Sequence, residues 1–194
     1  MKLKEWDQRY RSGQAAFDTP APLVAKISAG LVPGRALDVA CGAGRNAIYL
    51  ARLGWRVKAM DGSAAAIETL SQRAGGSPIE TAVVDLQQEP LLLDTGAWDL
   101  IVDSYYLQRD LFPLLMRALR PGGILIAIVH LGDPATPRRM VTGELRSMFE
   151  GWNILHYYEG APTEACHRQP VAEIAARKPS HLLTSQELRT RTTP

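Results

Sequence analysis

The sequence predicts an α/β fold with a doubly wound, mainly parallel sheet, and two observations favour this class. Apolar segments without polar alternation are typical of parallel strands buried on both faces, and they occur at residues 35–40, 55–60, 80–84, 98–103 and 122–130. Helix-like segments alternate with them at residues 44–53, 63–73 and 108–119. This alternation predicts right-handed crossovers between parallel strands. A chain of 194 residues suits a single domain.

The residues before the first strand are expected to be helical. Residues 3–11 have a helical pattern. A second helix is predicted at residues 21–30, because prolines lie at its start and a glycine at its end. We expect region 1–30 to form a lid beside a sheet core at residues 35–178.

The end of the chain has a different pattern. A short helix is expected around residues 142–150, followed by strands at 152–160 and 170–178. Nine residues separate these strands, which is too few for a parallel crossover, so the two strands should pair antiparallel. For the tail, residues 180–194, a disordered segment and a peripheral helix both stay open.

Composition excludes several function classes. The 22 basic and 20 acidic residues are dispersed, so we expect no nucleic-acid partner. The longest aliphatic run, residues 124–129, is far shorter than the roughly 20 residues of a membrane helix. No apolar stretch follows the first lysines, so we expect a cytoplasmic protein without a secretory signal. The two cysteines have no metal-ligand spacing, and we expect no metal. The oligomeric state stays open.

An acidic residue lies at or just after the end of four predicted strands: Asp38, Asp61, Asp85 and Asp103. Ligands of doubly wound sheets bind beyond the carboxyl ends of the strands, where these acids should meet. The segment 42–47 between the first strand and the next helix also fits the dinucleotide pattern G-x-G-x-x-G/A. An NAD-dependent oxidoreductase is therefore one interpretation.

Asp38 argues against a dinucleotide. A carboxylate in the glycine turn would face the pyrophosphate, and two like charges 4 Å apart repel by about 4 kcal/mol at an effective dielectric of 20. S-adenosylmethionine carries an ammonium and a sulfonium and no phosphate, so the same carboxylate favours its binding. Gly42 and Gly44 would admit the methionine moiety, Asp61 would accept the ribose hydroxyls, and Asp85 with Leu86 would lie at the adenine edge.

Several motifs resemble one family. DVACGAGRN (38–46), MDGS (60–63), VVDLQ (83–87) and the PGG turn (121–123) are similar to the motifs of class I S-adenosylmethionine-dependent methyltransferases. That resemblance implies a seven-stranded sheet with the last strand antiparallel. More narrowly, WDQRY (6–10), GRNAIYLA (44–51), YLQRDLFPLL (106–115) and GELRSMFEGW (143–152) look like the tellurite-resistance methyltransferase group. Departures from the commonest pattern are Cys41 in the glycine loop and His130 at the end of the fifth strand.

These observations give a candidate site with two sides. For the cofactor, S-adenosylmethionine, we expect contacts from Trp6, Tyr10, Asp38, Ala40, Cys41, Gly42, Gly44, Arg45, Asn46, Asp61, Gly62, Ser63, Asp85, Leu86, Asp103 and Ser104. For catalysis we expect His130, His167, Arg168 and Arg109.

The acceptor is expected to be a small molecule, and two kinds stay open. The cations would orient an oxyanion such as tellurite or selenite, which needs no base. An organic thiol, amine or hydroxyl compound would instead need His130 as the general base. A protein that senses S-adenosylmethionine without transferring its methyl group is a further alternative.

Overall fold

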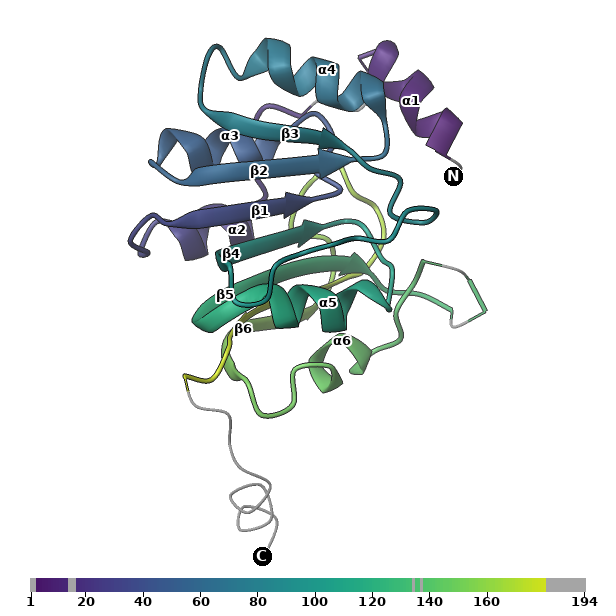
Figure 1. Ribbon diagram of the computed structural model, residues 1–194. Helices are drawn as coiled ribbons and strands as arrows, with labels where there is room; N and C mark the ends of the chain where they lie inside the picture. Colours follow the sequence, from purple (N-terminus) through teal and green to yellow (C-terminus); the bar gives the residue numbers. More distant parts are fainter. Residues whose placement is uncertain (1–2, 14–16, 134, 137, 181–194) are drawn as a thin grey trace, which may run out of the picture.

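The computed structural model describes residues 3–13, 17–133, 135–136 and 138–180. A seven-stranded sheet has the order β3-β2-β1-β4-β5-β7-β6, and Figure 1 shows it from β3 at the top to β6 at the bottom. The strands are β1 (Arg35–Val39), β2 (Arg56–Asp61), β3 (Ile79–Val83), β4 (Trp98–Ser104), β5 (Leu119–His130), β6 (Asn153–Gly160) and β7 (Val171–Arg177). The helices are α1 (Leu3–Arg11), α2 (Pro22–Ser28), α3 (Arg45–Arg52), α4 (Ala64–Arg73), α5 (Leu111–Ala118) and α6 (Glu144–Ser147).

The strand pairings confirm the predicted fold class. Strands β1 to β5 pair parallel with their neighbours. Strand β7 pairs antiparallel with both β5 and β6, as the short connection between the last two strands predicted. The carboxyl ends of the parallel strands therefore meet at one edge, on the right of Figure 1.

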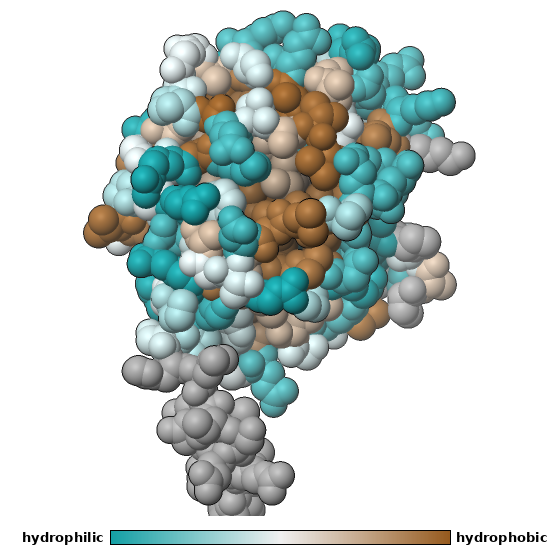
Figure 2. Space-filling model, viewed as in Figure 1, coloured by the Kyte–Doolittle hydropathy of each residue, from teal (hydrophilic) through white to brown (hydrophobic). Residues whose placement is uncertain are grey.

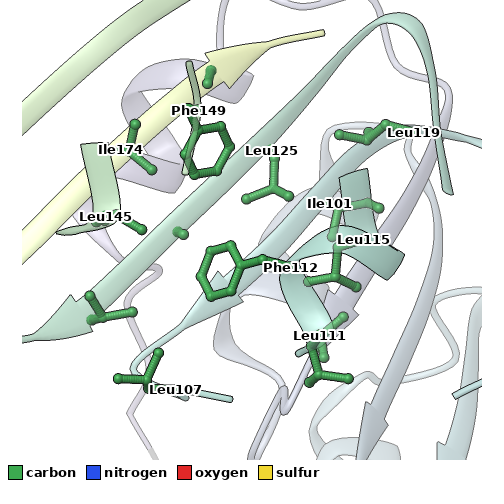
Figure 3. Close-up of a cluster of buried hydrophobic side chains, with 14 of the residues drawn as sticks. Ile101, Leu107, Leu111, Phe112, Leu115, Leu119, Leu125, Leu145, Phe149 and Ile174 are labelled. Carbon is green, nitrogen blue, oxygen red and sulfur yellow. The ribbon is translucent and has the colours of Figure 1, made fainter. Parts of the chain in front are cut away.

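Two apolar cores pack against the two faces of the sheet. Side chains of α2, α3 and α4 form one core with β1, β2 and β4. Side chains of α5 and α6 form the other, in which the ring of Phe112 meets Phe149 edge-on at 6.3 Å (Figure 3). Residues 84–97, all of them described, form no helix and cover part of this second face with Leu86, Leu91 and Leu93. Apolar surface lies in the middle of the same face in Figure 2.

The largest departures from the predicted bounds occur in three elements. Strand β5 begins at Leu119 rather than at residue 122, because Leu119 pairs with Trp98 beyond an irregularity in the register. The PGG turn therefore lies inside the strand. Helix α5 begins at Leu111 instead of residue 108. Helix α6 covers only Glu144–Ser147 of the predicted 142–150, since Gly143 precedes it in a left-handed conformation and turns follow it. Apart from Ser180, the predicted tail lies outside the described residues.

Candidate active site

The turn after β1 brings the backbone close to the carboxyl edge of the sheet. Three of its residues have positive φ: Ala40 at 50°, Gly42 at 55° and Gly44 at 79°. A Cβ atom on Gly44 would lie 2.1 Å from Cδ1 of the buried Leu70. Glycine is required at position 44 on both grounds, conformation and space.

Asp38 and Asp61 fix this turn from two strands. Asp38 is 1 % exposed, and its Oδ2 accepts a hydrogen bond from the Ala47 N–H in α3 at 3.0 Å. Asp61 accepts from the Gly42 N–H at 2.9 Å and from the Ser63 N–H at 2.8 Å. Burial raises the pKa of both carboxyl groups, that of Asp38 to about 7. Both acids therefore hold the backbone around the turn in place by accepting hydrogen bonds from its N–H groups.

Asp103 is the unsatisfied acid of the site. Its side chain is fully buried near the end of β4, and no described donor reaches either of its carboxylate oxygens. The neighbouring Ser104 hydroxyl also has no hydrogen-bond partner among the described residues. Burial, and after it the charge of Asp38, raises the pKa of Asp103 well above its usual range. A cation bound at this edge would offset the cost of burying the two carboxylates, Asp38 and Asp103, in their charged form.

The acid after β3 has a more local environment. Strand β3 ends at Val83, and Asp85 follows it in a turn whose Gln87 N–H donates to the Asp85 carboxylate at 3.0 Å. Leu86 beside it is buried in the core that contains α5. Its backbone carbonyl accepts from the Gln108 amide at 3.0 Å. Asp85 and Leu86, which we expect at the adenine edge of the cofactor, therefore lie next to the segment that leads into α5.

Helix α1 covers the cofactor side. The carboxylate of Asp7 accepts from the Ser63 hydroxyl at 2.8 Å and from the Ala65 N–H at 3.1 Å, so α1 is bound to the first turn of α4 (Figure 1). Trp6 stacks on Tyr10 with ring centroids 6.1 Å apart. The Tyr10 hydroxyl lies 2.4 Å from where a Cβ of Gly42 would be, and a Cβ of Gly62 would lie 3.0 Å from Leu3. The helix therefore lies directly over the glycine turn.

Three residues predicted for the cofactor make other contacts. The side-chain oxygen of Asn46 accepts from the Ala21 N–H at 2.9 Å and so binds the start of α2. Cys41 is buried, and its thiol donates to the Gly42 carbonyl at 3.4 Å. Burial raises the pKa of this thiol well above its usual range, so it is no thiolate nucleophile. Arg45 binds Glu164, which lies in the connection between β6 and β7.

The rings of Tyr105, His130 and His167 lie close together near the end of β5. His167 stacks on Tyr105 with centroids 3.7 Å apart and an interplanar angle of 8°. The His130 ring lies 5.2 Å from each of these two rings. Within the described residues, His130 Nδ1 and His167 Nε2 are buried without a hydrogen-bond partner. His130 and His167, two of the residues expected for catalysis, thus lie close together beside the Tyr105 ring.

Both histidines are held neutral. Burial, followed by the charges of His167 and Arg139, lowers the pKa of His130 to about 4. Burial also lowers the pKa of His167, while the Glu164 carboxylate opposes this effect. At neutral pH each ring therefore has one nitrogen without a proton, which can accept a hydrogen bond or a proton.

An ion pair that the sequence did not reveal lies behind these rings. The Arg45 guanidinium binds both carboxylate oxygens of Glu164, at 2.5 and 3.0 Å. The Tyr105 hydroxyl donates to the same carboxylate at 2.8 Å. Tyr105 has a φ of 64°, in the left-handed region that side chains rarely adopt. The surrounding contacts therefore hold the tyrosine in a strained conformation.

The two other predicted cations differ in their environments. Arg168 is exposed next to His167. The guanidinium of Arg109 binds the Glu144 carboxylate and donates to the Arg139 carbonyl at 2.7 Å. Arg109, which we expect for catalysis, thus has its charge paired with that of Glu144. A cavity of about 570 Å³ opens beyond the end of β5, lined by Leu131, Gly132, Val141, Thr142 and Pro170.

Two negative findings concern the described part of the chain. No group of three or more histidine, cysteine, aspartate or glutamate side chains there is placed to hold a metal ion. Nor does any helix in the described ranges have the length and apolar character needed to cross a membrane.

The fold and the acidic carboxyl edge define a Rossmann-like protein of the class I methyltransferase type. The crystal structure of TehB from Haemophilus influenzae shares this fold, with a TM-score of 0.71 and 22 % identity over 89 % of this chain and 67 % of that one. The family model described as Tellurite resistance protein TehB matches residues 18–169. The chain belongs to this family.

Two curated relatives match about two thirds of this chain. Hemagglutinin 1 of Eikenella corrodens is 27 % identical over 141 residues, which are 66 % of this chain and 47 % of the relative. The probable S-adenosyl-L-methionine-dependent methyltransferase TehB of Haemophilus influenzae is 26 % identical over 142 residues, 66 % of this chain and 49 % of the relative. The chain spans about half the length of the curated relatives it matches.

Proposed function

We propose that the protein transfers a methyl group from S-adenosylmethionine to a small acceptor. The observation that carries this proposal is the buried Asp103 carboxyl group, which finds no donor among the described residues and lies beside a second buried acid, Asp38. A dinucleotide would bring phosphate charges to this edge, where they would be repelled. A cationic ligand is attracted there, and the name of the Haemophilus relative agrees with it.

The cofactor side has residues for each part of this ligand. Asp38 and Asp103 would face its cationic methionine moiety, and the glycine turn would admit that moiety close to the backbone. Each Asp61 oxygen accepts one backbone N–H and keeps capacity to accept a ribose hydroxyl. Tyr10 on α1 would exclude water from above. When bound, S-adenosylmethionine would supply a methyl group that an acceptor nucleophile attacks in line, while the carbon–sulfur bond breaks and the sulfonium leaves as a neutral thioether.

The acceptor side is formed by the neutral rings of His130 and His167 together with Arg168. We propose a tellurite- or selenite-type oxyanion as the acceptor, because Arg168 is exposed beside His167 and the family description refers to tellurite resistance. Such an oxyanion attacks through a lone pair, so this chain needs only to orient it. The neutral His130 supports a second candidate, a protic organic acceptor whose proton the ring would remove.

Calorimetry with purified protein tests the cofactor. We expect stoichiometric binding of S-adenosylmethionine and of its demethylated product, and no binding of NADH. Binding of NADH alone would reject the proposal. Tight binding of S-adenosylmethionine without transfer to any acceptor in a broad panel would instead indicate a sensor.

Labelled S-adenosylmethionine tests the acceptor. Transfer to tellurite or selenite that is lost in Arg168→Ala and retained in His130→Ala would support the oxyanion. Arg52→Ala, which changes an exposed arginine at the end of α3, is the matched control. Transfer only to neutral thiols or phenols, abolished by His130→Ala, would favour the organic acceptor. The cytoplasmic location and the single-domain organisation stay predictions from the sequence.

A further inference from the structure

Glu164 joins two parts of the site that are far apart in the chain. It lies in the connection between β6 and β7, and its carboxylate binds Arg45, the first residue of α3. The exposed fractions of the two side chains are 10 % for Arg45 and 8 % for Glu164. An ion pair so shielded from water is held in one geometry and is little screened by salt.

The same carboxylate also determines where the histidine lies. Tyr105 donates its hydroxyl proton to Glu164, and its ring face carries His167 at 3.7 Å. The Glu164 carbonyl accepts from the His167 N–H at 3.0 Å, which closes the turn between them. Glu164 therefore contacts His167 through the backbone and through the tyrosine.

Most other residues of this connection are exposed. Residues 165, 166, 168 and 169 face solvent, and a second side-chain contact that holds the loop is the hydrogen bond from Thr163 to Glu173. That contact lies before Glu164; after it, the His167 ring contacts Tyr105, His130 and Phe17. Among the described contacts of this loop, the Arg45 ion pair is the charged one that joins it to α3.

We propose that Glu164 is a positioning residue: its ion pair with Arg45 locks the loop 161–169 against the start of α3 and so seats His167 at the acceptor side. Because Arg45 follows the glycine turn directly, the lock joins the backbone that would hold the cofactor to the loop that would receive the acceptor. The consequence for catalysis rests on the proposed methyl transfer. The placement of the loop does not.

NMR of the full chain without ligand tests the lock directly. The chain has four histidines, and His167 is the one whose ring stacks on a tyrosine within the described residues, so its ring protons should be shifted upfield by Tyr105. In Glu164→Gln we expect these protons to move toward the values of free histidine. Amide hydrogens of residues 163–168 should exchange at least about tenfold faster. Glu150→Gln, an exposed glutamate after α6, should change neither reading.

Two further variants separate the lock from a general loss of folding. Tyr105→Phe keeps the ring stack and the ion pair but loses one hydrogen bond, so its effect should be smaller than that of Glu164→Gln. The double change Arg45→Glu with Glu164→Arg restores opposite charges and should recover part of the lost protection. An unchanged His167 spectrum and unchanged exchange in Glu164→Gln would overturn the proposal.

Kinetics then test the catalytic consequence. In Glu164→Gln we expect kcat to fall by roughly tenfold to a hundredfold, since misplaced groups lose that much, with little change in the KM for S-adenosylmethionine. Equal kcat in wild type and variant would refute the positioning role. A wild-type protein that binds no S-adenosylmethionine would refute the proposed function and leave the exchange result on the lock standing.

Discussion

Replacing Asp38 by asparagine should make the ligand-free protein more stable at neutral and alkaline pH. The carboxyl group is 1 % exposed, and burial raises its pKa from 3.8 to about 7. Asparagine has the same shape, carries no charge, and keeps an oxygen for the Ala47 N–H. The substitution therefore removes the cost of a buried charge and leaves the hydrogen bond to α3.

The sign and size of the effect follow from proton linkage. Between pH 3.8 and 7 the folded protein keeps a proton on Asp38 that the unfolded chain has released. Fewer protons are then bound in the unfolded state, so the free energy of unfolding falls as pH rises through this window. At roughly 1.4 kcal/mol for each pH unit, the charged carboxylate lowers the stability by about 4 kcal/mol above pH 7.

Urea unfolding at pH 4, 6 and 8 measures this difference. We expect Asp38→Asn to exceed wild type by up to about 4 kcal/mol at pH 8, and the difference to vanish near pH 4. Asp94→Asn, which changes an exposed aspartate, is the control and should show no such trend. A variant less stable than wild type at pH 8, or a difference independent of pH, would refute the reasoning. Calorimetry should show weaker binding of S-adenosylmethionine by Asp38→Asn, because a charge that attracts its cations is lost.

Three further outcomes are expected. Gly44→Ala should lower stability by roughly 2–5 kcal/mol in urea unfolding, because a left-handed residue is combined with a clash against Leu70; Gly143→Ala, with a similar φ and open space, should lose only the conformational part. Asp7→Ala should lower the free energy of unfolding by about 1 kcal/mol, because the contacts of Asp7 at the start of α4 are lost. The pKa of Asp7 lies below its usual value, so wild type should lose this advantage as pH falls through that lowered pKa. Equal stability of the two proteins at pH 7 would contradict the expectation. Hydrogen exchange in α1 and in the loop after β5 should slow when S-adenosylmethionine is added, whereas equal protection with and without it would mean that no lid closes.

The elements of the sheet could be predicted because their signals are local. Continuous apolar runs marked β1 to β5, and a connection of nine residues was enough to make the last two strands antiparallel. The boundary of β5 could not be predicted in the same way. Proline and two glycines normally end a helix, and only the pairing of Leu119 with Trp98 on a neighbouring strand shows that they lie within this one.

The candidate site could be predicted where it follows the strand ends, and less well elsewhere. Asp61 and Asp103 lie where the order of strands and acids predicted. Glu164 was missed because its partner is 119 residues away and no periodic pattern links the two. The ion pair of Arg109 with Glu144, 35 residues later, was missed for the same reason.

The end of β4 separates, along the sequence, the residues proposed for the methyl donor from those proposed for the acceptor. All residues proposed for the methyl donor lie at or before Ser104, and the residues proposed for the acceptor, His130, His167 and Arg168, lie after it. A chimera with its crossover at this peptide bond would keep the donor site and take its acceptor pocket from a relative. Arg45 and Glu164 fall on opposite sides of the crossover, so such exchanges should succeed when the incoming segment brings an acid to meet the resident arginine.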